Sequence, residues 1–379
     1  MNNKINSIQI LRAVAVILVI YNHSIIICTD NNYNFSFQRN FLYLRHWTSI
    51  GLDLFFVISG LIMAIVTRSY IKKPSGWYNF LLKRVVRIVP LYWLYSLVVY
   101  FERSMIKHAI TPGEIIKTLL FFPLLAAKNT LLPIIGQGWS LSYEMYFYLL
   151  IVILLMLKKK KNIFRNLLVA MVVLAVVGYF INPADLTLKF ISTPILIEFS
   201  LGLAVGMGYH YVTVHYTQIR IGLIKYSGVA TLLVGLTLML ASLFYDSQYI
   251  SNPAYVISNN SIALYRSLIW GLPCSIFVFG ILLTEYTFKL EMPSILVRIG
   301  DASFSGYLSH ILIIVSVGWL YTRVGLRNGD AFIIIATLAS TIISLPLYTY
   351  IEKPILNLSN RLLFPAKVPA ELTPVKEMS

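Results

Sequence analysis

Charged residues are scarce in this sequence. Only 12% of its 379 residues are Asp, Glu, Lys or Arg, whereas 58% are hydrophobic and the mean hydropathy is +0.75. Soluble globular domains carry about 25% charged residues, so the composition excludes an ordinary soluble domain. Because the hydrophobic residues gather into membrane-length runs, we predict an all-α polytopic membrane protein.

Cysteine is nearly absent as well. Cys28 and Cys274 are the two cysteines, and both lie at apolar positions, where we interpret them as small buried hydrophobic residues. The sequence also lacks a metal-ligand spacing, a glycine-rich phosphate loop, a nucleophile elbow and an internal repeat. We therefore expect no metal cofactor. The chemistry must come from isolated polar residues within the apolar runs.

The few charges are unbalanced, with 31 Lys and Arg against 15 Asp and Glu. In a soluble domain this excess would indicate a nucleic-acid partner. Here the basic residues fall between apolar runs, where membrane topology explains them, and we expect no nucleic acid.

Ten apolar runs are interpreted as transmembrane helices. The first run lacks a small-residue cleavage site, so we expect a retained helix and not a removed signal peptide. The segment 115–132 is apolar but short and interrupted by Pro123 and Pro133, which predicts a re-entrant or interfacial piece. The ten predicted helices span 8–28, 48–67, 88–102, 135–157, 166–181, 190–208, 226–245, 263–284, 302–323 and 331–350.

The distribution of basic residues orients these helices. With the N-terminus in the cytoplasm, 21 of the 31 basic residues fall on the cytoplasmic side, as the positive-inside rule requires. Counting 115–132 as a further span would move the run Lys158–Lys161 outside. We therefore expect both termini in the cytoplasm, with a membrane domain over 1–357 and a short cytoplasmic tail over 358–379.

Arg12 and His23 lie in the first predicted helix. Eleven residues make close to three helical turns, so both side chains share one face, about 16 Å apart along the axis. Ionisable side chains are costly in hydrocarbon and usually mark a pathway, a partner or a reaction centre. We take His23 as the candidate base.

Asp53 lies about one turn inside the second predicted helix, at a depth similar to that of His23. A carboxylate beside an imidazole fixes its tautomer and favours the imidazolium, which prepares a histidine for general-base catalysis. We expect Asp53 to meet His23. The alternative is a purely structural capping or pairing role for Asp53.

Arg84 and Arg87 begin the third predicted helix, and Tyr92 and Trp93 follow them. Three positions apart, the two arginines share a helix face and suit a phosphorylated ligand held by forked guanidinium contacts. Alternatively, these residues only anchor the helix at the inner membrane surface, where basic and aromatic residues are common.

Two further ionisable residues lie inside predicted helices. Glu144 is surrounded by aromatic residues in the fourth predicted helix. We interpret it either as catalytic or as a protonated, hydrogen-bonded packing residue. His310 lies near the cytoplasmic start of the ninth, and is interpreted as a ligand contact or as a satisfied core histidine.

Taken together, these residues resemble the acyltransferase 3 family of integral membrane acyltransferases. The resemblance covers about residues 5–357. The matching features, in family order, are Arg12 with His23, Phe55–Phe56 with Ser59–Gly60, Arg84 with Arg87, Trp139–Leu141 with Glu144, Tyr307 with His310, and Glu352–Pro354.

The resemblance implies transfer of an acetyl group from cytoplasmic acetyl-CoA to a hydroxyl of a cell-surface carbohydrate at the bacterial inner membrane. The acceptor is expected to be lipid-linked, in an O-antigen, capsule or exopolysaccharide. His23 is then the catalytic histidine, with Asp53 and Glu144 assisting. The implied acetyl-CoA contacts are Arg12, Arg84, Arg87, Tyr92, Trp93 and His310.

Three other functions are considered. Succinyl or another acyl transfer to a glucan is the nearest alternative within the enzyme class. A transporter or flippase of lipid-linked sugars would show an inverted repeat or paired broken helices, and the sequence has neither. A non-catalytic membrane sensor would not need both a phosphate clamp and a buried base.

Overall fold

The computed structural model describes residues 5–33, 42–105, 110–121, 133–157, 162–215, 221–245 and 247–364. Within these ranges the secondary structure is helical, without a β-strand. Nine helices there are long and apolar enough to cross a membrane, and Ile50–Val66 is a shorter apolar helix of 17 residues. These ten segments correspond to the ten predicted spans, so the prediction of an all-α polytopic membrane protein is confirmed.

The helices of the described ranges follow in chain order. Their bounds are α1 Asn6–Asp30, α2 Leu42–Trp47, α3 Ile50–Val66, α4 Arg68–Ile71, α5 Gly76–Met105, α6 Pro112–Leu119, η2 Gly136–Gly138, α7 Trp139–Met156, α8 Ile163–Ile181, α9 Leu186–Ile191, α10 Leu196–Val214, α11 Ile221–Ala241, η3 Ser242–Phe244, α12 Gln248–Ser251, α13 Pro253–Ser258, α14 Asn260–Arg266, η4 Ser267–Gly271, α15 Leu272–Phe288, α16 Ser294–Asp301, α17 Ser303–Arg323, α18 Gly329–Leu347, η5 Tyr348–Glu352 and α19 Lys353–Leu363.

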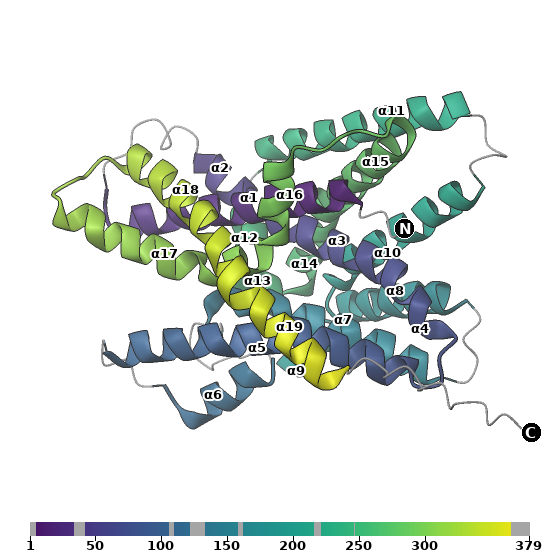
Figure 1. Ribbon diagram of the computed structural model, residues 1–379, viewed down its shortest axis with the longest axis horizontal. Helices are drawn as coiled ribbons and strands as arrows, with labels where there is room; N and C mark the ends of the chain where they lie inside the picture. Colours follow the sequence, from purple (N-terminus) through teal and green to yellow (C-terminus); the bar gives the residue numbers. More distant parts are fainter. Residues whose placement is uncertain are drawn as a thin grey trace, which may run out of the picture.

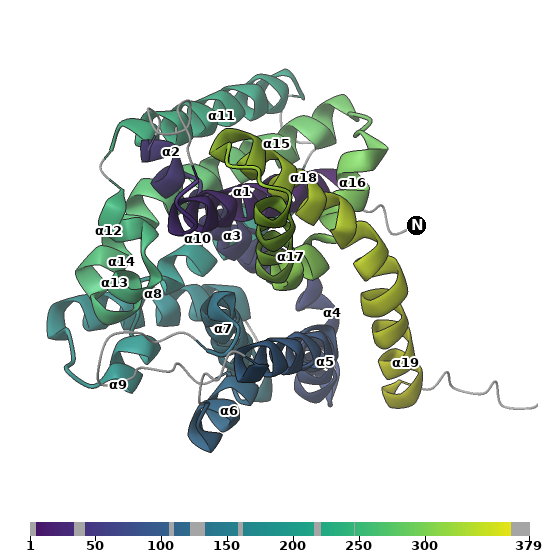
Figure 2. The same cartoon turned by 90° about the vertical axis from the view of Figure 1, so that its left-hand side faces the viewer.

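Helices α1 and α3 occupy the middle of the bundle. In Figures 1 and 2, α11 lies on one side of them and α5 with α6 on the other. Helix α3 packs closely on α10, because a Cβ atom on Gly60 or Gly202 would collide with the backbone of the facing helix. Small residues allow such backbone contact between membrane helices, and here they hold α3 in a fixed position.

Helix α5 is longer than predicted. It begins at Gly76, well before the predicted start at residue 88, and continues through Pro90. Proline removes one helical hydrogen bond, which other contacts in a packed membrane bundle can compensate. As a consequence, Arg84 and Arg87 lie in the interior of a continuous helix and not at its first turn.

The predicted re-entrant segment 115–132 is described only as far as residue 121, and residues 122–132 lie outside the described ranges. Helix α6 starts at Pro112 after a capping box formed by Thr111 and Glu114. Its 8 residues rise about 12 Å, which is too short to cross a bilayer.

A π-helical turn, η5, precedes α19 and fixes the start of α17. Glu352 in this turn accepts hydrogen bonds from the Ser305 backbone N–H at 3.1 Å and from its hydroxyl at 2.6 Å. Single π turns are frequent at functional sites. This one anchors the first turn of the helix that carries Tyr307 and His310.

Candidate active site

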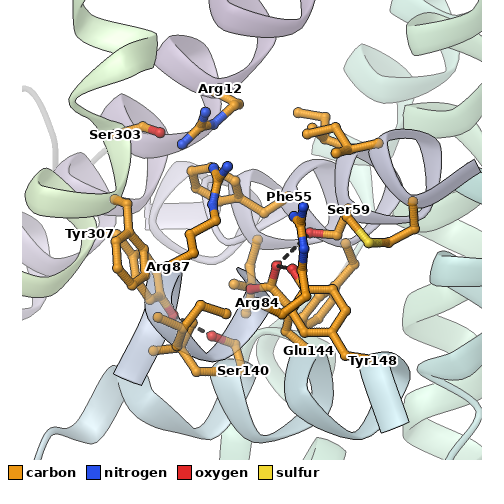
Figure 3. Close-up of a pocket in the computed structure, with 18 residues that line it drawn as sticks. Arg12, Phe55, Ser59, Arg84, Arg87, Ser140, Glu144, Tyr148, Ser303 and Tyr307 are labelled. Carbon is orange, nitrogen blue, oxygen red and sulfur yellow. Dashed lines mark hydrogen bonds between the residues drawn. The ribbon is translucent and has the colours of Figure 1, made fainter. Parts of the chain in front are cut away.

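Three arginines from two helices line one cavity, which we call the arginine pocket. Arg12 comes from α1, and Arg84 and Arg87 come from α5. Figure 3 shows the guanidinium groups of Arg12 and Arg87 turned toward each other across this space. The cavity encloses about 710 Å³, counting the space at its open mouth. Its other lining residues are Leu52, Phe55, Phe56, Ile58, Ser59, Ile62, Met63, Ile88, Ser140, Leu141, Glu144, Tyr148, Ser303, Phe304 and Tyr307.

Arg84 is the most buried of the three arginines that line the pocket. It is 8% exposed, and its guanidinium carbon lies 5.6 Å from the Phe80 ring centre and 5.9 Å from that of Tyr148. Its Nε atom is buried and has no hydrogen-bond partner within the described part of the chain. A buried guanidinium N–H without a partner is costly, and an anionic ligand would satisfy it.

Glu144 lies in the wall of the arginine pocket. Its carboxylate accepts hydrogen bonds from the Ser59 hydroxyl, at 3.2 Å, and from the Tyr148 hydroxyl one turn away (Figure 3). Both donors line the same pocket. Glu144 is thus held on the arginine side of the site, whereas His23 lines a different cavity.

The second cavity, the histidine pocket, encloses about 800 Å³ including its mouth. His23 lines it together with Trp139, and five polar residues contribute to its wall. These polar residues are Asn22, Ser49, Gln137, Ser251 and Arg266.

Leu52 and Tyr307 line both cavities, and among the described residues they are the two that the linings share. Leu52 is 9% exposed and Tyr307 6%. The Tyr307 hydroxyl donates to the Gln137 carbonyl at 2.8 Å and lies 2.6 Å from the Ser140 hydroxyl. The two pockets are therefore neighbours, with Leu52 and a hydrogen-bonded Tyr307 between them.

His23 contacts a second histidine. Its Nδ1 atom lies 2.9 Å from the Val19 carbonyl oxygen and 3.3 Å from Nε2 of His310, and the ring centres are 4.8 Å apart. His310 is fully buried and absent from the lining of both pockets. The expected contact of His310 with acetyl-CoA therefore has no support in the geometry.

Asp53 does not pair with His23 as expected. Its two carboxylate oxygens accept from Nε and Nη2 of Arg266, at 2.9 Å and 2.7 Å, and both side chains are buried. A guanidinium offers a carboxylate two parallel charge-assisted hydrogen bonds, which a neutral imidazole cannot match. Asp53 thus has the structural pairing that was its alternative interpretation, and the predicted contact is wrong.

Arg266 was missed in the sequence, although an arginine within the predicted helix 263–284 is itself a signal. A second missed residue, Glu198 on α10, is fully buried and accepts from the Ser267 hydroxyl at 3.0 Å. Arg266 lines the histidine pocket, so the Asp53–Arg266 pair forms part of the support of that cavity.

Tyr92 and Trp93 lie outside the lining of the arginine pocket. Tyr92 is fully buried and stacks on Phe121, with ring centres 4.5 Å apart. Trp93 is exposed, and its Nε1 donates to the Leu119 carbonyl at 3.1 Å. Both residues hold the α6 region against α5. This role differs from the contact with acetyl-CoA that was expected of them.

Comparison with known proteins gives two matches. A family model described as an acyltransferase domain matches residues 5–349. The chain is 27% identical over 322 residues to the exopolysaccharide production protein ExoZ of Rhizobium meliloti (strain 1021), a match that covers 82% of this chain and 91% of that protein. No solved structure matches the chain.

Proposed function

Because the chain belongs to the acyltransferase 3 family and is thus a membrane acyltransferase, we propose that it transfers an acetyl group from acetyl-CoA to a hydroxyl of a cell-surface carbohydrate. The observation that carries this proposal is the pair of neighbouring pockets, one lined by three arginines and the other by His23. The similarity to an exopolysaccharide production protein supports a carbohydrate acceptor. We place the reaction at the bacterial inner membrane.

The arginine pocket suits the donor. Coenzyme A carries several phosphate groups, and Arg12, Arg84 and Arg87 supply guanidinium donors around one cavity. We assign the phosphates to these three side chains and the cytoplasmic side of the membrane to this pocket, in keeping with the excess of basic residues predicted there. The pantetheine arm then extends toward Leu52 and Tyr307.

The histidine pocket suits the acceptor. Amide, hydroxyl and guanidinium groups in its wall offer hydrogen bonds to sugar hydroxyls, and Trp139 offers an aromatic surface. We propose that a lipid-linked carbohydrate enters this pocket from the outer side. Its reacting hydroxyl then lies beside His23.

His23 is assigned the role of general base. Its free ring nitrogen takes the proton of the sugar hydroxyl while the hydroxyl oxygen attacks the thioester carbonyl carbon. The new C–O bond forms, the C–S bond breaks, and the proton passes from His23 to the departing thiolate of coenzyme A. Such a base contributes about 10²- to 10⁴-fold to the rate.

Direct transfer is preferred over an acetyl-histidine intermediate. Since Leu52 and Tyr307 belong to both pockets, donor and acceptor can meet without a covalent relay. Holding two reactants in one geometry can alone supply several kcal/mol, with about 7–11 as the upper range.

The test uses surface polysaccharide from a deletion strain complemented with the parent gene or with His23→Ala. NMR of the polysaccharide should show one acetyl signal that is lost on deletion, restored by the parent and not by His23→Ala. The signal would also identify the acetylated position. Acetylation at the parental level with His23→Ala, or a succinyl signal in place of the acetyl signal, would contradict this assignment.

A further inference from the structure

We propose that His310 is a positioning residue that, together with the Val19 carbonyl, holds the His23 ring with the proton on Nδ1 and the lone pair of Nε2 available to the acceptor. The inference rests on the proposed function of His23 as general base. It is carried by the hydrogen-bond geometry of the two rings and by their places relative to the histidine pocket.

The proton positions follow from the partners of each nitrogen. Nδ1 of His310 lies 2.7 Å from the Tyr307 carbonyl oxygen and 3.2 Å from that of Gly306. A carbonyl oxygen only accepts, so Nδ1 of His310 carries its proton. In the neutral ring Nε2 is then an acceptor.

His23 has a carbonyl partner at Nδ1 as well. Its Nδ1 lies 2.9 Å from the Val19 carbonyl oxygen and therefore also carries a proton. That N–H lies 3.3 Å from Nε2 of His310. If Nε2 of His310 were protonated as well, two N–H groups would face each other, so His310 is neutral and accepts from His23.

One consequence concerns the free nitrogen of His23. With Nδ1 occupied by Val19 and His310, the remaining nitrogen, Nε2, holds the lone pair, and His23 lines the histidine pocket. The ring is thereby oriented for proton abstraction in that pocket. His310 performs this task while being completely buried and outside both pockets.

A second consequence concerns charge. In many hydrolases a carboxylate orients the histidine and stabilises its imidazolium. Here Asp53, the expected carboxylate, is engaged by Arg266, and the partner of His23 is a neutral imidazole. This contact adds no negative charge, so His23 rests as the neutral base and becomes charged only while it holds the proton in transit.

The direct test is NMR of protein labelled with ¹³C and ¹⁵N at its 6 histidines and reconstituted in lipid bilayers. The signal lost in His23→Gln belongs to His23, and its chemical shifts report the tautomer. We expect Nδ1–H in the parent protein. A parent His23 protonated on Nε2, or charged at neutral pH, would overturn the proposal without any variant of His310.

Variants of His310 supply the second readout. His310→Phe keeps a buried ring without an acceptor, whereas the amide oxygen of His310→Gln can accept from His23. We expect His310→Phe to lower kcat about tenfold or more, with KM for acetyl-CoA unchanged, because the Val19 carbonyl alone then holds the His23 ring. His310→Gln should recover part of kcat.

These assays use radiolabelled acetyl-CoA and membranes of the deletion strain as the source of acceptor. A parental kcat in His310→Phe would contradict the positioning role. The failure of the proposed function is a separate outcome: His23→Ala would then transfer acetyl groups normally, even if the parent His23 shows the expected tautomer.

Discussion

Arg266 and Asp53, 213 positions apart in the chain, form a bidentate ion pair with both side chains buried, 1% and 0% exposed. Arg266 also donates to the carbonyl oxygens of Ile250, at 2.7 Å, and of Ser49, at 3.3 Å. The guanidinium thus connects α14 to α3 and to the short helix α12. This connection forms one wall of the histidine pocket.

Removing one partner of this pair should destabilise the protein. A buried charge left alone costs about 3–5 kcal/mol, whereas replacing both partners by apolar residues of similar size is often neutral. We therefore expect Arg266→Met to lower the thermal unfolding temperature strongly and Asp53→Leu combined with Arg266→Met to restore most of it. The measurement is the loss of monodisperse protein on heating in detergent.

This pair of variants also separates a structural role of Asp53 from a catalytic one. If the double variant is stable and retains acetyl transfer, Asp53 acts through the ion pair alone. A stable double variant without any transfer would place one member of the pair in the reaction, either Asp53 in the chemistry or Arg266 in acceptor binding.

Arg84 and Arg87 are expected to bind the phosphates of the donor. Hydrogen bonds to charged groups contribute about 1.5–3 kcal/mol, so Arg84→Ala or Arg87→Ala should weaken acetyl-CoA binding about 10- to 100-fold. Calorimetric titration of purified protein with acetyl-CoA measures this. A short acetyl thioester without the nucleotide should show turnover that is insensitive to either change.

Lys83→Ala is the matched control for these arginines. Lys83 lies on the same helix and is exposed, with its ammonium over the Phe364 ring and outside the pocket lining. It should leave acetyl-CoA affinity unchanged. Equal affinity of Arg84→Ala, Arg87→Ala and the parent would remove the phosphates from this pocket.

Leu52 is expected to limit the size of the acyl group and to keep water from the thioester. Leu52→Ala enlarges the passage between the pockets, so we expect increased hydrolysis of acetyl-CoA relative to transfer, together with use of longer donors such as butyryl-CoA. The ratio of free acetate to acetylated carbohydrate measures the first effect.

Leu54→Ala controls for lost packing. Leu54 is fully buried on the same helix and lines neither pocket, and a buried Leu→Ala change costs about 2–5 kcal/mol at either position. It should lower stability without changing that ratio. An unchanged ratio of acetate to acetylated carbohydrate in Leu52→Ala would mean that residues other than Leu52 separate the two pockets.

The membrane helices were predictable from the sequence because each is a run of apolar residues, and burial in lipid requires this of every helix. The start of α5 was not, since the apolar run that marks the span begins after Arg87, whereas the helix extends back to Gly76 through a stretch that mixes apolar and basic residues. Estimated depth in the membrane suggested a contact between Asp53 and His23. Depth gives no angle around the helix axis, and the pairing with Arg266 depended on that angle.

The sequence indicates individual candidate residues of the site but not their arrangement. The polar residues of α1, α5 and α7 were recognisable because they are exceptions within apolar runs. That Arg12 shares a cavity with Arg84 and Arg87, or that His310 touches His23, depends on how helices far apart in the chain pack together. The periodicity of a single helix contains no such information.

The last prediction concerns the topology on which transfer across the membrane depends. If both termini are cytoplasmic and the segment 115–132 does not cross, the region near Ser251 faces outward and the region near Asn162 faces the cytoplasm. We choose Tyr249→Cys and Asn166→Cys, because both positions are exposed whereas Asn162 itself has a left-handed backbone, with φ 60°.

An impermeant thiol reagent added to intact cells should label Tyr249→Cys and spare Asn166→Cys until the cells are opened. The parent protein should show little labelling, because Cys28 and Cys274 are both fully buried. We expect this because basic residues are in excess on the cytoplasmic side. That excess is preserved only if the chain crosses the membrane an even number of times between Arg84 and Asn162. Labelling of Asn166→Cys from outside would place an odd crossing there, and the arginine pocket could then no longer be assigned to the cytoplasmic acetyl-CoA.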